Sequence, residues 1–172
     1  MLPITLDMKY VNAVVVGEGY ATERRIRILK ESGAENIRIF KEPPEVSEYE
    51  GASIVFVGGF DNKKSAEIAK QVRDCGALLN IEDKKQYCDF HMPSIVRRGD
   101  LLIATSTGGA SPRLARRIKE KLEGIFSDDW SGYLKEIKTK RNIWIAEKTE
   151  YDELIRKTDD LIEEMGVFGD NK

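Results

Sequence analysis

Short apolar runs alternate along the chain with segments of helical periodicity, and no other feature constrains the fold as strongly. Val11–Val16 is an apolar run that ends at Gly17, which is typical of a strand buried on both faces of a sheet. Strands that alternate with helices at short spacing form right-handed βαβ units, so we expect an α/β fold with a parallel sheet. Runs of the same kind predict four further strands, at Ile37–Phe40, Ser53–Val57, Leu78–Ile81 and Leu101–Thr105.

Two helices are predicted between these strands. Helical periodicity runs from Ala21 to Ser32, directly after the first strand and its glycines. It returns over Lys63–Cys75, where Asn62 is a plausible N-cap. Each helix follows a strand, as a βαβ unit requires.

The chain changes texture after residue 110. Ser111 and Pro112 have the residue types of an N-cap and a first helical position, and Gly124 is expected to end that helix. Highly charged helical segments follow at 130–140 and 150–165. We therefore place a boundary near 106–112, between a domain 1–110 and a smaller, mainly helical region 111–172. The apolar face of 150–165 must be covered, either by the domain itself or by another subunit.

Charge and composition exclude several classes of protein. The 172 residues carry 28 basic and 30 acidic side chains, a net charge of −2, so a general nucleic-acid surface is not expected. No apolar run approaches the ~18 residues of a membrane span, and the N-terminus shows no secretory signal. Cys75, Cys88 and His91 do not form a metal-binding motif. We expect a soluble cytoplasmic protein with reduced thiols and no permanent metal.

A glycine loop follows the first strand and leads into a helix. In the stretch 17–22, GEGYAT, Gly17 permits a tight turn and Gly19 lets the backbone approach a pyrophosphate. The helix opens within this stretch, at Tyr20 and Ala21, and its N-terminus supplies N–H groups for that anion. Thr22 stands where close helix packing favours glycine or alanine. The loop predicts a dinucleotide site in a Rossmann-type domain, although a glycine-rich turn of any α/β protein is the alternative.

The end of the second predicted strand is where such domains recognise the adenosine ribose. Glu42 lies near the expected position, between Lys41 and Pro43, and is interpreted either as a ribose-binding carboxylate or as an ordinary surface charge. Lys41 leaves the choice between NAD and NADP open, because a cation could pair with a 2′-phosphate.

A second glycine loop, at 105–112, precedes the next helix and lies among basic residues. Ligands of an open α/β sheet bind beyond the carboxyl ends of its strands, and the strand before this loop is predicted to join the sheet, so we expect both glycine loops to face the same crevice. Hydroxyls, backbone N–H groups and arginines at this loop suit a small ligand with several negative charges. We expect a ligand role for Thr107, Gly108, Gly109 and Arg113. Solvation of a helix face is preferred for Arg116, Lys119 and Lys121.

Carboxylates directly follow the fourth predicted strand. Asp83, at the end of the stretch 80–83, NIED, is a candidate acid or base, because it would face the cofactor crevice. A solvated turn residue is the bland alternative. His91, between apolar neighbours, is interpreted as a hydrogen-bonded structural residue rather than a ligand.

Three stretches of this sequence resemble the precorrin-2 dehydrogenase family, which also forms the N-terminal part of siroheme synthase. They are 14–25 (VVVGEGYATERR), 79–95 (LNIEDKKQYCDFHMPSI) and 97–122 (RRGDLLIATSTGGASPRLARRIKEKL). The C-D-F-x-x-P segment and the S-T-G-G-x-S-P loop are the most specific parts. The resemblance implies oxidation of precorrin-2 to sirohydrochlorin with NAD⁺, homodimers formed through the region after the Rossmann domain and, in some members, insertion of Fe²⁺.

The resemblance also implies roles for particular residues. Asp83 corresponds to the family's catalytic aspartate, and Thr107–Gly109 to its substrate loop. The cofactor positions fall on Gly17, Gly19, Tyr20, Ala21, Lys41, Glu42, Pro43 and Gly58. Departures from the usual pattern are Glu18 for Gly, Thr22 for Ala, Gly58-Gly59-Phe60 for Ala-Ala-Thr, and Lys84 for a second acid.

The arginines near the second loop agree with this chemistry, because precorrin-2 carries many carboxylates. A dinucleotide-sensing regulatory module without catalysis remains as an alternative. It explains the first glycine loop equally well, but it gives no purpose to Asp83 or to the loop at 107–112.

Overall fold

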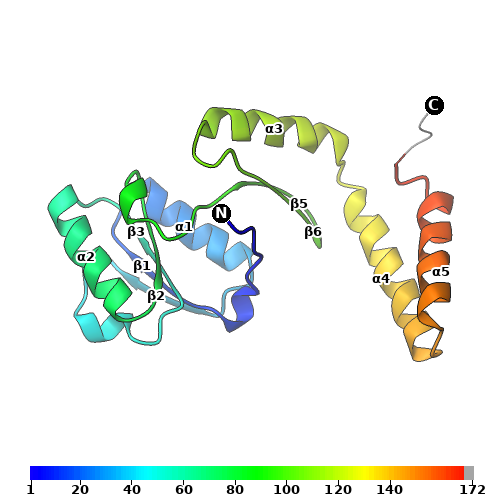
Figure 1. Ribbon diagram of the computed structural model, residues 1–172, viewed down its shortest axis with the longest axis horizontal. Coiled ribbons are helices and arrows are strands. Elements are labelled where there is room, and N and C mark those ends of the chain that lie inside the picture. The colour runs from blue at the N-terminus through cyan, green and yellow to red at the C-terminus, as the bar shows by residue number, and fades with distance from the viewer. Residues whose placement is uncertain (169–172) are drawn as a thin grey trace. The chain divides into compact units, whose positions relative to one another are not determined.

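The computed structural model describes residues Met1–Phe168, which form two compact units: Met1–Met92, and a second unit that begins at Pro93 and includes the remaining described residues (Figure 1). The division falls between Met92 and Pro93, earlier than the boundary at 106–112 that the sequence suggested. The reason lies in the predicted strand Leu101–Thr105, which pairs within the second unit.

Four parallel strands form the sheet of the first unit, in the order β2-β1-β3-β4. They are β1 (Asn12–Val16), β2 (Asn36–Phe40), β3 (Ile54–Val57) and β4 (Leu78–Ile81). The order reverses direction between β1 and β3, so the carboxyl ends of these two strands mark the switch point at which α/β sheets bind ligands. The α/β fold of Rossmann type is confirmed, with four of the five predicted strands in the parallel sheet.

Helices α1 (Tyr20–Glu31) and α2 (Asn62–Asp74) cover opposite faces of this sheet. On one face, Val14 and Val16 of β1 pack with α2. On the other, Val15 packs with α1. Apolar side chains at successive positions of β1 are therefore buried in both directions, which is why the sequence shows a run rather than an alternation. Short 3₁₀ turns lie at Met8–Tyr10 (η1), Val46–Tyr49 (η2) and Lys85–Tyr87 (η3).

The N-cap of α2 is Asp61 rather than the predicted Asn62. The Asp61 carboxylate accepts a hydrogen bond from the backbone N–H of Lys64 at 2.8 Å. Both residues have N-cap chemistry, and aspartate followed by asparagine leaves the boundary open by one residue.

The second unit begins with a hairpin. Strand β5 (Ser94–Arg98) pairs antiparallel with β6 (Leu101–Thr105), so the expectation that 101–105 joins the parallel sheet is wrong. Gly99 has φ +57° and is the first of two residues between the paired Arg98 and Leu101. A glycine with positive φ at that position makes the tight turn of a two-residue hairpin.

Helix α3 (Pro112–Ile125) follows β6 and packs on both hairpin strands. Ser111 is its N-cap, as predicted, and accepts a hydrogen bond from the Leu114 N–H at 3.2 Å. Gly124 lies inside the helix rather than ending it. Arg98 binds the other end, because its Nε donates to the Phe126 carbonyl at 2.8 Å. The guanidinium thus satisfies a carbonyl that has no partner in the helix.

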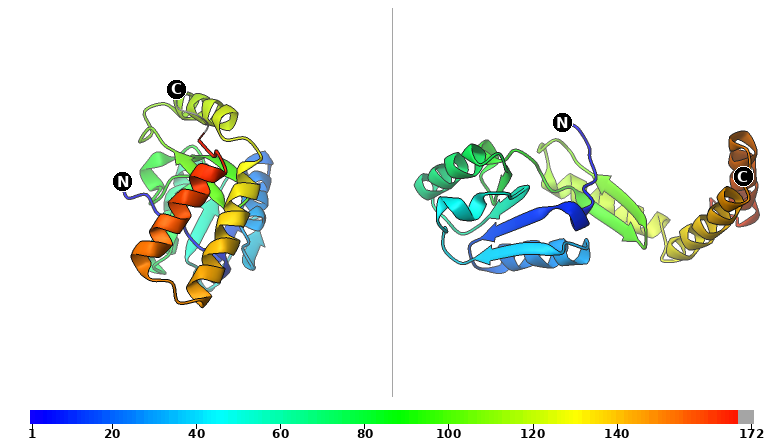
Figure 2. Two further views of the ribbon diagram at one scale, coloured as in Figure 1. Left: turned by 90° about the vertical axis from the view of Figure 1, so that its right-hand side faces the viewer. Right: turned by 90° about the horizontal axis from the view of Figure 1, so that it is seen from below.

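Helices α4 (Trp130–Ala146) and α5 (Tyr151–Glu164) form a helical hairpin and lie side by side (Figure 2). Leu154 of α5 is buried, but Ile155 remains 41% exposed. The apolar face predicted for 150–165 is therefore only partly covered within the unit. No helix of the described residues is long and apolar enough to span a membrane.

Candidate functional site

The first glycine loop and the loop after β3 meet at the switch point. A Cβ on Gly17 would lie 2.0 Å from the carbonyl oxygen of Gly58, so the two loops fit together only because residue 17 is glycine. Gly17 also has φ +119°, and its N–H donates to the Phe40 carbonyl at 2.8 Å. The predicted roles of Gly17 and Gly58 thus have a shared structural basis, a close approach of two backbones.

Helix α1 begins at this loop with an open first turn. Gly19 is the N-cap, has φ +94°, and no side chain caps the helix. Nothing lies within 4 Å of the position that a Cβ would take on Gly19. Tyr20 is 77% exposed and Ala21 is half-buried. A bare backbone at a helix N-terminus is the arrangement that holds a dinucleotide's diphosphate, so the predicted cofactor loop fits that group.

Thr22 is buried beneath the loop. Its hydroxyl donates to the carbonyl of Glu18 at 3.3 Å, which ties the first turn of α1 to the loop. A Cβ on Gly58 would lie 3.1 Å from the Thr22 Oγ1 and 3.1 Å from the Glu82 Oε2. Threonine is accommodated at position 22 because residue 58 has no side chain.

The residues after β2 lie beside the same loop. Lys41 forms an ion pair with Glu18, with its Nζ 2.8 Å from the Glu18 Oε1. Hydrogen bonding to Glu18 raises the pKa of Lys41, so the lysine stays protonated. Glu42 is exposed and makes no hydrogen bond or ion pair with the described residues, and Pro43 is half-buried. The predicted ribose position therefore carries three charged groups, one of which comes from the glycine loop.

A cavity of about 120 Å³ opens on the α1 face, at the carboxyl ends of β1, β3 and β4. Its polar lining includes Arg25, Asn80 and Glu82. The Arg25 guanidinium lies 5.5 Å from the centre of the Phe56 ring. Burial lowers the pKa of Arg25, as does the neighbouring Arg24. Sequence reasoning did not single out these side chains as a site, because they converge only once α1 packs on the sheet.

Asp83 lies in a turn directly after β4. The Lys84 N–H donates to the Ile81 carbonyl at 3.4 Å and closes the turn, and Asp83 has φ +56°. Aspartate tolerates this left-handed conformation better than most residues, and such positions are enriched at functional sites. The carboxylate is exposed and makes no hydrogen bond or ion pair with the described residues. It is available to a substrate.

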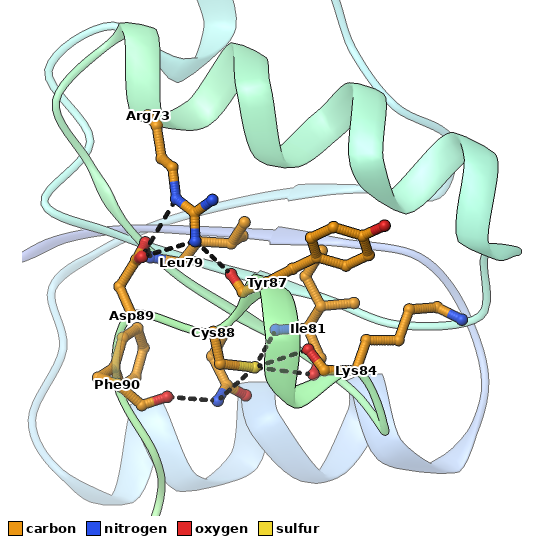
Figure 3. Close-up of polar contacts among 9 residues, drawn as sticks. Arg73, Leu79, Ile81, Lys84, Tyr87, Cys88, Asp89 and Phe90 are labelled. Atoms are coloured by element: carbon orange, nitrogen blue, oxygen red, sulfur yellow. Dashed lines mark hydrogen bonds and ion pairs between the residues drawn. The ribbon is translucent and has the colours of Figure 1, made fainter.

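The Cys88 thiol contacts the backbone at both ends of this turn (Figure 3). Its Sγ accepts a hydrogen bond from the Ile81 N–H at 3.3 Å and lies 3.2 Å from the Ile81 carbonyl and 3.4 Å from the Lys84 carbonyl. The Asn80 side chain adds a contact of 3.7 Å to the sulfur. The thiol therefore binds both ends of the turn that carries Asp83.

The residues after Cys88 are fixed along β4. The Asp89 carboxylate accepts a hydrogen bond from the Leu79 N–H at 3.0 Å and forms an ion pair with Arg73 at 2.8 Å (Figure 3). The Asn80 amide donates to the Phe90 carbonyl at 2.8 Å. The C-D-F segment, which the resemblance singled out, thus holds the turn in place through its contacts with β4. His91, in contrast, is exposed and makes no hydrogen bond with the described residues, so the interpretation of a hydrogen-bonded histidine is wrong.

The second glycine loop, in the second unit, is held by its own hydroxyls. Thr107 Oγ1 donates to the Ser111 carbonyl at 3.0 Å and accepts from the Ser111 N–H at 3.1 Å. Gly108 and Gly109 have φ of +62° and +85° and are exposed. Since β6 is not part of the parallel sheet, the argument that its loop must face the same crevice as Gly17 no longer applies, and the shared crevice stays a prediction.

The basic residues around the second loop divide into two groups. Arg113 is exposed, in the first turn of α3, and makes no hydrogen bond or ion pair with the described residues. Arg116 and Lys119 pair with acids one turn along α3, at 3.0 and 3.1 Å, and their solvation of the helix face stays a prediction, as it does for Lys121. Within the described part of the chain, no group of three or more potential metal ligands comes together.

A parallel sheet with this strand order, and a Gly-x-Gly turn at its switch point, defines a dinucleotide-binding α/β domain of the Rossmann type. The chain belongs to the family described as "Putative NAD(P)-binding", whose model matches residues 4–94. Residues 98–125 match a second family, "Sirohaem biosynthesis protein central". The family resemblance inferred from the three sequence stretches is confirmed.

Curated relatives carry the name siroheme synthase. The protein from Nitrosococcus oceani is 31% identical over 143 residues, which cover 72% of this chain and 31% of the relative. That from Zymomonas mobilis is 28% identical over 86% of this chain and 35% of its own length. This chain therefore spans about a third of the length of these relatives.

A solved structure named SirC, precorrin-2 dehydrogenase, is similar in fold. Its TM-score to this chain is 0.75, at 22% identity, with 94% of this chain and 89% of the other covered. At this level of identity the likeness establishes the fold.

Proposed function

We propose that this protein oxidises precorrin-2 to sirohydrochlorin in siroheme biosynthesis, with NAD⁺ as the hydride acceptor. One observation carries the proposal. Asp83, at the end of β4, is fixed in a left-handed turn with its carboxylate unengaged, in the same unit as the glycine cradle at the switch point. The names of the relatives and of the structural neighbour agree with this chemistry.

The reaction removes two hydrogens from the macrocycle. One leaves as a hydride, which NAD⁺ accepts when bound, and the other leaves as a proton, so that NADH and H⁺ are formed. Asp83 is the group of this chain that takes the proton. Its exposed carboxylate has no competing partner among the described residues, and the contacts of Cys88 hold its turn in place.

The cofactor is held by the loop between β1 and α1. The N–H groups at Gly19, Tyr20 and Ala21 bind the diphosphate, and the tight approach of Gly17 to Gly58 keeps side chains out of the way. The segment Lys41–Pro43 would contact the adenosine ribose. These residues bind and orient the cofactor.

The substrate's carboxylates are bound by the second unit. Arg113 has no partner among the described residues, and the loop at Thr107, Gly108 and Gly109 presents exposed backbone next to the N-terminus of α3. Thr107 contributes through its loop rather than as a free hydroxyl, because Ser111 engages its oxygen twice. A guanidinium and backbone N–H groups suit a polycarboxylate.

The protein acts in the cytoplasm as a homodimer, without nucleic-acid or membrane partners. The half-exposed apolar side chains of α4 and α5, such as Ile143 at 48% and Ile155 at 41%, support burial by a second copy. Light scattering during size-exclusion chromatography measures the mass directly. A monomer of 19.5 kDa at micromolar concentration contradicts the dimer.

The decisive experiment incubates the protein with precorrin-2, with and without NAD⁺, and follows the absorption spectrum. We expect sirohydrochlorin only when NAD⁺ is present. Asp83→Asn should bind NAD⁺ as the native chain does and lose turnover by about 10²- to 10⁴-fold, because general acid–base catalysis contributes that much. Asparagine also tolerates the positive φ, so the turn is kept. Asp159→Asn, at an exposed and unpaired position of α5, is the matched control.

Two outcomes contradict the proposal. NAD⁺ binding without oxidation of precorrin-2 favours a dinucleotide-sensing module, and full activity of Asp83→Asn removes Asp83 from the reaction. A parallel incubation of sirohydrochlorin with Fe²⁺ tests metal insertion. Siroheme formed faster than in a protein-free control establishes that activity, with Fe²⁺ as a substrate.

A further inference from the structure

We propose that Glu18 makes the site prefer NAD over NADP by holding Lys41 in an ion pair. Glu18 lies in the cofactor loop and Lys41 directly after β2, with the Lys41 Nζ 2.8 Å from the Glu18 Oε1. The inference rests on the dinucleotide binding of the proposed function and on nothing else in it.

The position of the pair is set by the sheet. Strands β1 and β2 are parallel neighbours, and Val16 is paired with Phe40 at their carboxyl ends. Lys41 directly follows Phe40, and Glu18 lies two residues after Val16. The end of the second strand is where Rossmann-type domains distinguish a ribose 2′-hydroxyl from a 2′-phosphate. The ion pair therefore lies at the position that reads the difference between NAD and NADP.

The turn itself does not require a glutamate. In the Gly-x-Gly pattern the middle position is free, and the conformation depends on Gly17 and Gly19. What Glu18 adds is a carboxylate directed at Lys41. Without that carboxylate, Lys41 would be an unpaired cation at the ribose position, the usual means of binding a 2′-phosphate.

Electrostatics then favour the dinucleotide without the extra phosphate. Glu18, Lys41 and the unpaired Glu42 together carry one net negative charge. A 2′-phosphate would meet two carboxylates and a lysine that is already paired, whereas a 2′-hydroxyl can donate to a carboxylate. Arg38, a further cation of β2, is bound to Glu48 at 3.7 Å and to the Glu50 carbonyl.

The test measures the Kd of NAD⁺ and of NADP⁺ by isothermal titration calorimetry. Four proteins are compared: the native chain, Glu18→Gln, Lys41→Gln and the double variant. Glu18→Gln keeps the size and the exposed position of the side chain. We expect the native chain to bind NAD⁺ at least tenfold more tightly than NADP⁺. In Glu18→Gln the Kd of NADP⁺ should fall at least fivefold, while that of NAD⁺ stays within twofold.

The double variant shows whether the gain acts through Lys41. Adding Lys41→Gln to Glu18→Gln should abolish the improvement for NADP⁺. The improvement should also shrink in 0.5 M salt, because Lys41 is exposed and salt screens its attraction to the 2′-phosphate. Asp74→Asn is the matched control. It breaks another exposed lysine pair, Lys70 with Asp74 at 2.6 Å on α2, and should leave both Kd values unchanged.

The results separate this inference from the proposed function. Native binding of NAD⁺ with no change in the NAD⁺-to-NADP⁺ ratio in Glu18→Gln overturns the inference and leaves the function standing. Native preference for NADP⁺ also overturns it. If the native chain binds neither dinucleotide, the proposed function fails and the inference fails with it.

Discussion

Replacement of Gly17 by alanine tests the close approach of two backbones at the switch point. The added Cβ would lie 2.0 Å from the Gly58 carbonyl oxygen, where ordinary contact begins at 3.4 Å, so the loops would have to separate by well over an ångström. They cannot do so freely, because the Gly58 N–H donates to the Val16 carbonyl at 3.0 Å. Overpacking and a positive φ of +119° together should lower the free energy of unfolding by about 3–5 kcal/mol.

Two other glycines supply matched controls. Gly33 has φ +82° and nothing within 4 Å of an added Cβ, so Gly33→Ala should cost only the backbone strain, about 1–2 kcal/mol. In Gly58→Ala the nearest atoms are side-chain oxygens at 3.1 Å, and the exposed Glu82 can turn away. We expect that variant to cost less than Gly17→Ala.

Urea unfolding followed by far-UV circular dichroism measures these differences, and calorimetry measures NAD⁺ binding. Both tryptophans, Trp130 and Trp144, lie in the second unit, so their fluorescence reports on that unit alone. Gly17→Ala should lose NAD⁺ binding, whereas Gly33→Ala should keep it. If Gly17→Ala is as stable as Gly33→Ala and binds NAD⁺ normally, the close approach does not shape the site.

Three further predictions concern stability. Burial raises the pKa of Tyr49 to about 12, so the folded state holds this proton while the unfolded chain loses it; stability should be complete below pH 10 and fall between pH 10 and 12. Tyr49→Phe should weaken this loss of stability at high pH. It should also raise the stability at pH 7 by about 1 kcal/mol, because the buried hydroxyl has no partner among the described residues. Thermal melts over a range of pH measure both effects. Arg98→Ala should destabilise the second unit by about 1.5–3 kcal/mol, measured by tryptophan fluorescence, whereas the exposed Arg97→Ala should stay within about 0.5 kcal/mol. Asp89→Ala leaves the Leu79 N–H without its acceptor and should cost about 2–3 kcal/mol in urea; a loss no larger than that of Arg97→Ala contradicts the support of β4 by this side chain.

The parallel sheet could be predicted because its strands are buried on both faces. Val11–Val16 and Ser53–Val57 are apolar without interruption by charge, and only a central strand covered by two helices needs such a run. The glycine loop could also be predicted, because the positive φ at positions 17 and 19 favours glycine, and glycines are visible in the sequence.

The strand Leu101–Thr105 shows where that reasoning stops. Its apolar run reads like the others, yet it pairs antiparallel with Ser94–Arg98. Periodicity reports burial, not the partner of a strand. The available signal for a hairpin was Gly99-Asp100, the two residues that join Arg98 to Leu101.

Side-chain contacts within the site were the least predictable part. Asp83 was found through its place after a strand, but the contact of Cys88 with its turn depends on the path of the chain through η3. Likewise, nothing in the sequence links Glu18 with Lys41, which are brought together by the pairing of β1 with β2. Such contacts exist only after the backbone has folded.

The contacts of Cys88 and Asp89 with β4 also cover backbone groups at the edge of the parallel sheet. β4 is the last strand on its side, and unpaired N–H and C=O groups on an edge strand invite pairing with another chain. Here the Leu79 N–H is occupied by a carboxylate, and the Leu79 carbonyl accepts from the Asp89 N–H at 2.8 Å. The segment that steadies Asp83 thereby also shields the molecule from self-association through β4, so damage to it would threaten solubility as well as chemistry.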